Sequence, residues 1–387
     1  MSLPQSQATD PKSIDWANLG FSYVQTKSFV RHVWRADQGW SEAELVQGTS
    51  YIPMHVATSG LHYGQNCFEG LKAFRGPDGR VRLFRPELNA TRLGESAVKV
   101  GMEPPPEDLF LKACRLAVED NIEYVPPHGS GGALYVRPLL YGSEGQLSVD
   151  PSPEVTFIVF VVPVGDYYKG SGGVRGVDAL VDEQFDRAAP LGSGSAKLGG
   201  NYAPCLPSAI AAKRRGFPIS LYLDAKSHTY VEEFTTSNFI ALNHPSTPGQ
   251  GKIEGSSDSA PTFITPNSRS ILRSTTRRTL CELATYFGWK VEERPVAWSE
   301  VSGQAGDGSD GFSEVAACGT AVVITPVKRL VRGDQEVLVN GGASTMGPYM
   351  QKLYDTVRAI QSGTQEDIHG WLWPAQGITG TSSKDEE

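Results

Sequence analysis

A glycine-rich stretch at residues 165–176 separates two halves of the chain that each carry strand and helix patterns of their own. It holds five glycines and few apolar side chains, which indicates a connection between domains. The 387 residues are enough for two domains of ordinary size. We therefore expect a small N-terminal domain over 1–164, a linker over 165–176, a large C-terminal domain over 177–375 and a disordered tail over 376–387.

Both halves mix strand and helix patterns. In the first half, the Gly-Pro-Asp-Gly turn at 76–79 joins two apolar runs into a hairpin, and strands are also expected at 21–26, 29–34 and 51–57. Pro86 begins a helix there, and Ser274 begins an amphipathic helix in the second half. The expected fold class is therefore α/β, with a smaller α+β domain and a larger mixed α/β domain.

The charge and the cysteine content argue against several classes of function. The net charge is -8 and the pI is near 5.5, which disfavours nucleic acid or an anionic membrane as the main partner. The five cysteines lie far apart without C-x-x-C spacing, so we expect a reducing compartment, no disulfide framework and no metal site. The longest apolar run, 157–164, is too short to cross a bilayer, and the N-terminus carries no signal pattern. We expect a cytoplasmic protein that acts on small molecules.

One lysine stands alone among glycine and small residues in the stretch 191–202. This composition leaves room for close backbone approach around Lys197. A phosphate-binding P-loop would need glycine before the lysine and serine or threonine after it, but Ala196 and Leu198 stand there. Lys197 is then either a nucleophilic amine that forms a Schiff base, typically with pyridoxal phosphate, or a solvated lysine in a surface loop.

Schiff-base chemistry on pyridoxal phosphate needs a carboxylate at the ring nitrogen of the cofactor. Glu232 and Glu233 stand in the middle of an otherwise apolar, strand-forming segment. Neighbouring strand residues face opposite sides, so at most one of the two can point into a given site. The alternative is a solvated charge pair on an edge strand.

The same cofactor needs a phosphate site and a hydroxyl near its phenolic oxygen. Thr275 and Thr276 at a helix start suit a phosphate, but they equally suit a plain N-terminal cap. Thr320 lies in a second turn of small residues. Arg92 could clamp a phosphate or lie at the surface, and Tyr202 could reach the phenolic oxygen or simply pack.

Five motifs, in order, resemble those of the branched-chain aminotransferases, which are class IV pyridoxal-phosphate enzymes of fold type IV. They are Cys67-Phe-Glu-Gly-Leu-Lys-Ala-Phe-Arg75, Arg82-Leu-Phe-Arg-Pro-Glu-Leu-Asn-Ala-Thr-Arg92, Tyr135-Val-Arg-Pro138, Lys197-Leu-Gly-Gly-Asn-Tyr202 and the E-x-x-T-x-N pattern Glu233-Phe-Thr-Thr-Ser-Asn238. The likeness runs from about residue 21 to residue 360. It implies a homodimer that transaminates leucine, isoleucine or valine with 2-oxoglutarate, giving 2-oxo acids and L-glutamate.

The resemblance also implies a role for each candidate residue. Lys197 would hold pyridoxal 5′-phosphate as a Schiff base and later move the 1,3-proton, with Glu233 at the pyridinium nitrogen and Tyr202 at the phenolic oxygen; Glu232 would then face away. The remaining cofactor-binding residues would be Arg92, Thr236, Thr275, Thr276 and Thr320. Substrate contacts would come from Phe21, Tyr63, Phe68, Tyr135, Arg137, Tyr167, Thr236 and Ala321, and from Leu147 and Val149 reaching the pocket of a partner subunit.

The chain departs from the family pattern in several places. Thr235 stands for the usual glycine and Phe234 for a small aliphatic residue, the loop 143–146 lacks the family's proline, and the insertion 243–261 is long. The C-x-x-C of some members is replaced at 322–325, so no thiol switch is expected. These departures bear on the side-chain preference more than on the chemistry. The alternative is a specialised class IV aminotransferase of secondary metabolism that acts on another aliphatic amino acid or amine. Other rivals are a D-amino-acid or (R)-amine relative, a lyase, and a catalytically silent scaffold.

Overall fold

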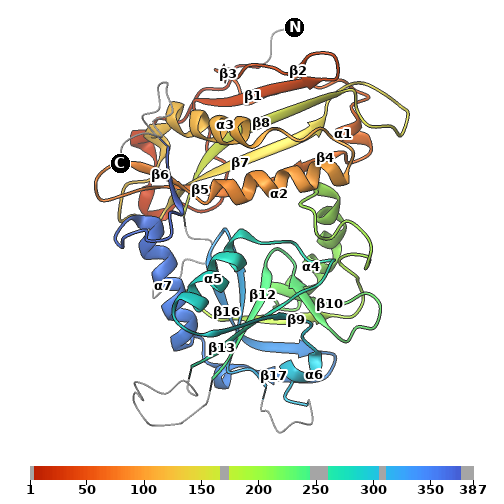
Figure 1. Cartoon of the computed structure of the whole chain (residues 1–387), viewed down its shortest axis with the longest axis vertical. Coiled ribbons are helices and arrows are strands. Elements are labelled where there is room, and N and C mark those ends of the chain that lie inside the picture. Colours follow the sequence, from red (N-terminus) through yellow and green to blue (C-terminus); the bar gives the residue numbers. More distant parts are fainter. Residues whose placement is uncertain (1–3, 166–173, 245–259, 305–310, 376–387) are drawn as a thin grey trace. The chain divides into compact units, whose positions relative to one another are not determined.

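The computed structural model describes residues 4–165, 174–244, 260–304 and 311–375 of the chain (Figure 1). The chain divides into two compact units, unit 1 with residues 1–166 and 358–387 and unit 2 with residues 167–357. The tail 376–387 and most of the expected linker and insertion lie outside the described residues. Residues 358–375, which the sequence assigned to the large domain, belong to unit 1.

Unit 1 contains, among its described residues, a 9-stranded sheet with the order β18-β6-β5-β7-β8-β1-β2, in which β3 also pairs with β1 and β4 with β7. All of these pairs are antiparallel. The strands are β1 (Ser28–Arg35), β2 (Gly39–Trp40), β3 (Glu44–Gln47), β4 (Asn66–Phe68), β5 (Leu71–Arg75), β6 (Val81–Phe84), β7 (Ala133–Gly142), β8 (Glu154–Val164) and β18 (Leu372–Pro374). The long central strands β7 and β8 are apolar along most of their length because a helical layer covers one face of the sheet.

Helices α2 (Pro86–Lys99) and α3 (Glu107–Asp120) form this layer and lie side by side (Figure 1). Helix α3 buries Phe110, Cys114 and Val118, which recur every four residues and therefore share one face. Proline at the first position of α2 suits a helix start because its missing N–H has no partner there in any helix. The short helix α1 (Ser59–His62) is a single turn.

The hairpin expected around residues 76–79 is confirmed by the antiparallel pairing of β5 and β6, and a helix begins at Pro86 as expected. The strands expected at 21–26 and 51–57 are wrong, because neither segment forms a strand. Their apolar side chains face outward: Tyr23, Tyr51 and Val56 are 59%, 52% and 81% exposed. Pro53 also lacks the N–H that a strand ladder needs.

The described part of unit 2 forms a second 9-stranded sheet with the order β11-β10-β9-β16-β15-β12-β13-β14, in which β17 pairs with β16. Strand β9 pairs parallel to β10 and β16, and β13 parallel to β14, whereas the other pairs are antiparallel. Because β11 also pairs with β12, the path from β11 to β12 closes into a ring. The strands are β9 (Val177–Asp182), β10 (Ile219–Leu223), β11 (Val231–Phe234), β12 (Asn238–Asn243), β13 (Thr262–Pro266), β14 (Lys290–Arg294), β15 (Glu314–Gly319), β16 (Val323–Arg332) and β17 (Gln335–Leu338).

Helix α4 (Leu206–Arg214) packs on β10, and α5 (Thr275–Tyr286) packs on β14 and β15. The other helices are α6 (Trp298–Val301) and α7 (Pro348–Ser362). Two short 3-10 turns, Gly199–Asn201 and Ala203–Cys205, precede α4. Unit 1 is thus an α+β unit and unit 2 a mixed α/β unit, which confirms the expected fold class.

Candidate active site

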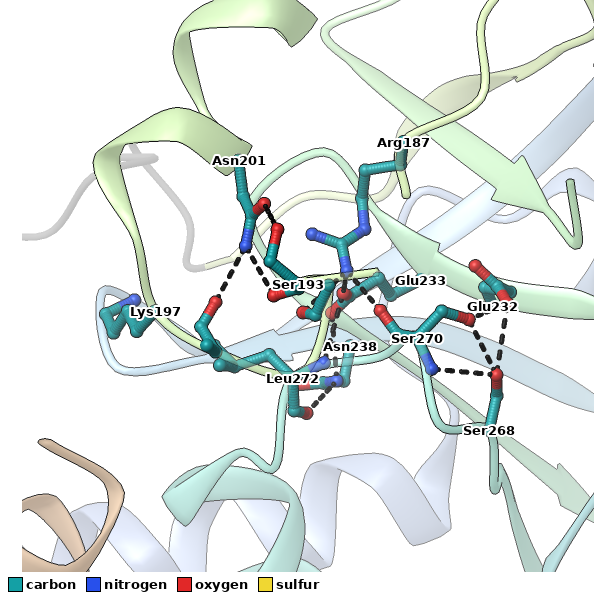
Figure 2. Close-up of polar contacts among 12 residues, drawn as sticks. Arg187, Ser193, Lys197, Asn201, Glu232, Glu233, Asn238, Ser268, Ser270 and Leu272 are labelled. Atoms are coloured by element: carbon teal, nitrogen blue, oxygen red, sulfur yellow. Dashed lines mark hydrogen bonds and ion pairs between the residues drawn. The ribbon is translucent and has the colours of Figure 1, made fainter. Parts of the chain in front are cut away.

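The loop that precedes α4 folds back on itself and carries Lys197. Asn201 closes this loop, since its amide donates to the carbonyl oxygens of Ser193 and Ala196, both at 2.8 Å (Figure 2). The amide oxygen of Asn201 accepts a third bond, also 2.8 Å, from the hydroxyl of Ser193. The side chain of Asn201 and the hydroxyl of Ser193 therefore help to fix the shape of the loop.

Lys197 and Tyr202 meet inside the turn that the loop makes. The Nζ atom of Lys197 donates to the hydroxyl of Tyr202 at 2.9 Å and lies 5.2 Å from the centre of its ring. Both side chains are half-buried. The geometry contradicts the alternative of a solvated lysine in a surface loop.

Glu233 lies on β11 opposite Asn238 of β12, so the E-x-x-T-x-N pattern is a tight hairpin whose first and last residues are cross-strand partners. The side-chain amide of Asn238 donates to Oε2 of Glu233 at 3.1 Å, and the backbone N–H of Leu272 donates to Oε1 at 3.2 Å. Glu233 is 4% exposed. The motif thus holds a carboxylate away from water with directed hydrogen bonds.

Glu232 is equally buried but lies in a different environment (Figure 2). Its Oε1 accepts from the hydroxyl of Ser268 at 3.1 Å and from the hydroxyl of Ser270. Burial raises the pKa of Glu232, and the two serine hydroxyls lower it. The alternative of a solvated charge pair on an edge strand is therefore wrong for both glutamates.

Arg187 is the functional residue that the sequence reasoning missed. Its guanidinium forms an ion pair with Glu233 and donates to the carbonyl oxygens of Gly194 at 3.0 Å and Ser270 at 2.6 Å (Figure 2). A single arginine ten residues before Lys197 gives no signal by itself, because most arginines lie at the surface. Only the long-range contact with β11 identifies it.

The groups around Glu233 shift the pKa of its carboxyl in opposite directions. Burial raises the pKa of this carboxyl to about 7. Arg187, the N–H of Leu272 and Lys197 each lower the pKa, while Glu232 raises it. Of the positive groups that act on Glu233, Arg187 has the larger effect and Lys197 the smaller.

Two further candidate threonines lie at the start of α5. Ser274 is the N-terminal cap, since its hydroxyl accepts from the N–H of Arg277 at 3.1 Å. Thr275 and Thr276 are the first two residues of the helix and are buried. The cap and the anion-site alternatives are therefore compatible, because the cap uses Ser274 and leaves the two threonines at the positive end of the helix dipole.

The turn between β15 and β16 carries Thr320 and Ala321, which are half-buried. Val323, at its end, has a φ of 71°, in the left-handed region that a β-branched residue rarely adopts. Such strain is typical of segments whose shape is tied to function. Thr236, in the hairpin after Glu233, is exposed.

Unit 1 holds Arg92 in a buried ion pair with Glu69. Nε and Nη2 of Arg92 donate to the two carboxylate oxygens, both at 2.7 Å, and Asn89 donates to the same carboxylate at 2.7 Å. The side chains of Arg92 and Glu69 are 7% and 0% exposed. The alternative of a surface arginine is wrong.

The aromatic candidates of unit 1 fall into two groups. Phe21 packs edge-on against Tyr135, with ring centres 6.3 Å apart, and the guanidinium of Arg137 lies 5.0 Å from the ring of Phe68 and 5.2 Å from that of Tyr135. Gly70 leaves room for this cluster, because a Cβ there would lie 1.9 Å from the Tyr135 hydroxyl.

In the second group, Tyr63 donates to the carbonyl of Leu147 at 2.7 Å. Leu147 and Val149 are 77% and 84% exposed. Tyr167 lies outside the described residues.

Two departures from the family pattern have structural roles. Phe234 is 1% exposed and stacks on Phe239 in the core of unit 2, with ring centres 5.9 Å apart. The hydroxyl of Thr235 donates to the carbonyl of Ser220 at 3.3 Å. The large side chain of Phe234 therefore packs inside the core of unit 2 and does not face solvent.

Comparisons with known proteins identify the family of the chain. The family model of class IV aminotransferases matches residues 66–330, and the chain belongs to this family. It is 38% identical to aminotransferase poxL of Penicillium oxalicum over 367 residues, 94% of each chain. It is 39% identical over 364 residues to a branched-chain-amino-acid aminotransferase of Helicobacter pylori, covering 94% of this chain and 98% of that one. The solved branched-chain amino acid aminotransferase of Escherichia coli matches with a TM-score of 0.69 at 26% identity, covering 89% and 99%.

Two searches of the described ranges gave negative results. No group of three or more His, Cys, Asp or Glu side chains in these ranges could hold a metal ion. No helix in the described part of the chain is long and apolar enough to cross a membrane.

Proposed function

We propose that this aminotransferase uses pyridoxal 5′-phosphate to transfer the amino group of leucine, isoleucine or valine to 2-oxoglutarate. The observation that carries the proposal is that unit 2 holds Lys197 hydrogen-bonded to Tyr202 and, on β11, the buried carboxylate of Glu233 with its hydrogen bond from Asn238. These side chains supply the amine, the hydroxyl and the buried carboxylate that the cofactor requires. Membership of the class IV family supports the same cofactor.

When bound, pyridoxal phosphate supplies an aldehyde carbon for the amine and a ring that accepts electrons. Lys197 would bind the cofactor through Nζ and would serve as the base that moves a proton during the exchange. Tyr202, 2.9 Å from Nζ, orients the amine. Glu233 would pair with the ring nitrogen of the cofactor, and Asn238 keeps that carboxylate in place.

In unit 2, the N-terminal end of α5, with Thr275 and Thr276, and Thr320 would bind the phosphate of the cofactor. Arg92 of unit 1 is proposed as a phosphate-binding residue from its motif. A helix N-terminus offers free N–H groups and a positive dipole end, which suit a phosphate dianion. Glu69 takes two donors of Arg92 and so fixes the plane of its guanidinium. Thr236 binds near the same cofactor.

The substrate side chain is received by Phe21, Tyr63, Phe68, Tyr135 and Tyr167. Burial of an aliphatic side chain against an aromatic lining is energetically favourable. Arg137, stacked on Phe68 and Tyr135, and Ala321 serve the carboxylate end.

The enzyme acts as a cytoplasmic homodimer. The exposed apolar side chains of Val56, Leu61, Leu147 and Val149 need a covering surface, and a second copy supplies one. Leu147 and Val149 then reach the substrate pocket of that copy.

The test is a visible absorbance spectrum of the purified protein with pyridoxal phosphate. We expect a bound-cofactor band that bleaches when L-leucine is added and returns with 2-oxoglutarate, and no such cycle in Lys197→Ala. A band that ignores leucine, isoleucine and valine would reject the substrate class. A protein that takes up no cofactor would reject the enzyme reaction itself.

A second candidate function is transamination of another aliphatic amino acid or amine. It is favoured by the likeness to aminotransferase poxL, whose name specifies no amino acid. A panel of aliphatic L-amino acids and amines, each tested with 2-oxoglutarate, separates the two candidates by their kcat/KM values.

A further inference from the structure

Arg187 lies against both buried glutamates of β11 and belongs to no motif of the site. Its side chain is 7% exposed and forms an ion pair with Glu233. The same guanidinium donates to the carbonyls of Gly194 and Ser270, in two segments that are far apart in the sequence (Figure 2). It therefore joins the lysine loop, the glutamate strand and the segment before α5.

We propose that Arg187 is a positioning residue that favours the ionised form of Glu233, so that a proton shared with the cofactor ring nitrogen lies on the ring and not on the carboxyl. The part of this statement that concerns the ring rests on the proposed function. The control of Glu233 by Arg187 concerns the protein alone.

The direction of the effect follows from charge and distance. A proton on Glu233 would put a neutral carboxyl beside the guanidinium of Arg187. A proton on the ring nitrogen of the cofactor would instead leave a carboxylate there. Moving the proton away from Glu233 thus moves positive charge away from Arg187 and restores an ion pair in a site closed to water. An opposite charge in direct contact lowers a carboxyl pKa by about 1–3 units.

The other groups around Glu233 cannot replace Arg187. Lys197 also lowers the pKa of Glu233, but less than Arg187 does, and this lysine is the amine used in the chemistry. The N–H of Leu272 and the amide of Asn238 are neutral donors. Among the other ionisable neighbours, Glu232 raises the pKa of Glu233. Glu233 in turn raises the pKa values of Cys205 and Cys318.

The experiment measures urea unfolding of the full chain, freed of cofactor, from pH 5 to pH 9. Wild type is compared with Arg187→Gln, which removes the charge, and Arg187→Lys, which keeps it. Each is also made with Glu233→Gln. Arg332→Gln is the matched control, because Arg332 also combines an ion pair with a carbonyl contact in unit 2 but lies outside the site.

In wild type, the loss of stability with rising pH should level off above about pH 7, the pKa of Glu233. In Arg187→Gln this loss should extend upward by ~1 pH unit or more. With Glu233→Gln in place, the effect of Arg187→Gln should no longer depend on pH. Arg187→Lys should keep the wild-type pH profile at a lower stability, and Arg332→Gln should give a loss that is the same at every pH.

If the stability of Arg187→Gln depends on pH in parallel with that of wild type, the proposal is overturned and Arg187 is a purely structural residue. If Arg187→Gln does not fold, a lysine variant whose profile departs from wild type by a full pH unit would overturn it equally. The second measurement is the absorbance of bound pyridoxal phosphate over the same pH range, which should depend on pH more strongly in Arg187→Gln than in wild type. A wild-type protein that takes up no pyridoxal phosphate overturns the proposed function, while the cofactor-free titrations still decide the role of Arg187.

Discussion

Glu69→Ala should be among the most destabilising single changes in unit 1. Glu69 is fully buried and accepts two bonds from Arg92 and one from Asn89, all at 2.7 Å. The backbone N–H of Gly70 donates to the same carboxylate at 3.2 Å. Removing the carboxylate leaves the Arg92 guanidinium buried without its counter-charge.

Loss of one partner from a buried ion pair costs about 3–5 kcal/mol. At about 2–4 °C per kcal/mol for a unit of this size, the melting temperature should fall by roughly 10 °C. Removing both charges, as in Glu69→Leu with Arg92→Met, should recover much of this loss, because no uncompensated charge remains. Cofactor affinity should not recover in the double variant, since Arg92 is the proposed phosphate clamp.

The assay is thermal and urea unfolding of the single and double variants, with Lys112→Ala as the control. Lys112 pairs with Asp108 at 3.0 Å, but the two side chains are 78% and 69% exposed, so its removal should leave the midpoint unchanged. A loss below about 1 kcal/mol for Glu69→Ala, or strict additivity in the double variant, would refute the reasoning.

Three further predictions concern unit 2 and the thiols. Glu233→Gln should lower turnover by at least about tenfold, whereas Glu232→Gln should cost much less, because Arg187 forms its ion pair with Glu233 while Glu232 is bonded to serine hydroxyls; the reverse order would contradict the assignment. The pKa of Glu233 is raised from 4.5 to about 7, so its contribution to stability is full below pH 4.5 and is lost as the pH rises through 7, by roughly 3 kcal/mol. Chemical denaturation of the cofactor-free protein at pH 4.5 and pH 8, with Glu233→Gln as reference, checks this. All five cysteines are buried, and burial raises the pKa of Cys281 to about 12, so a thiol reagent should label them only after unfolding.

Short-range patterns predicted the fold well where local chemistry decides the structure. The turn at 76–79 and the proline at position 86 fix backbone geometry within a few residues, and both predictions were confirmed. The strand expected at 51–57 failed because its apolar residues, such as Val56 at 81% exposure, face away from the core of unit 1. A hydrophobic run shows that a surface needs covering, but not which surface covers it.

The same division applies to the candidate site. Lys197 and Tyr202 are five residues apart, and so are Glu233 and Asn238, so each pair is contained in one short motif. Arg187 escaped notice because its partners, Glu233 and Ser270, are remote in the chain. The sequence could not choose between Glu232 and Glu233 without the resemblance, since both are buried and only their partners differ.

The glycine content around Lys197, which in the sequence indicated room for a ligand, has two separate causes. Gly194 is required by the protein itself, because a Cβ there would lie 2.1 Å from the carbonyl oxygen of Ser270, and Arg187 bonds to the carbonyls of both residues. Gly200, by contrast, has no atom within 4 Å of the position a Cβ would take. Gly194→Ala should therefore push the lysine loop away from the segment before α5 that carries Ser270, while Gly200→Ala should be tolerated unless a bound molecule fills that space. Comparing the two variants with and without pyridoxal phosphate distinguishes glycine kept for internal packing from glycine kept for a ligand.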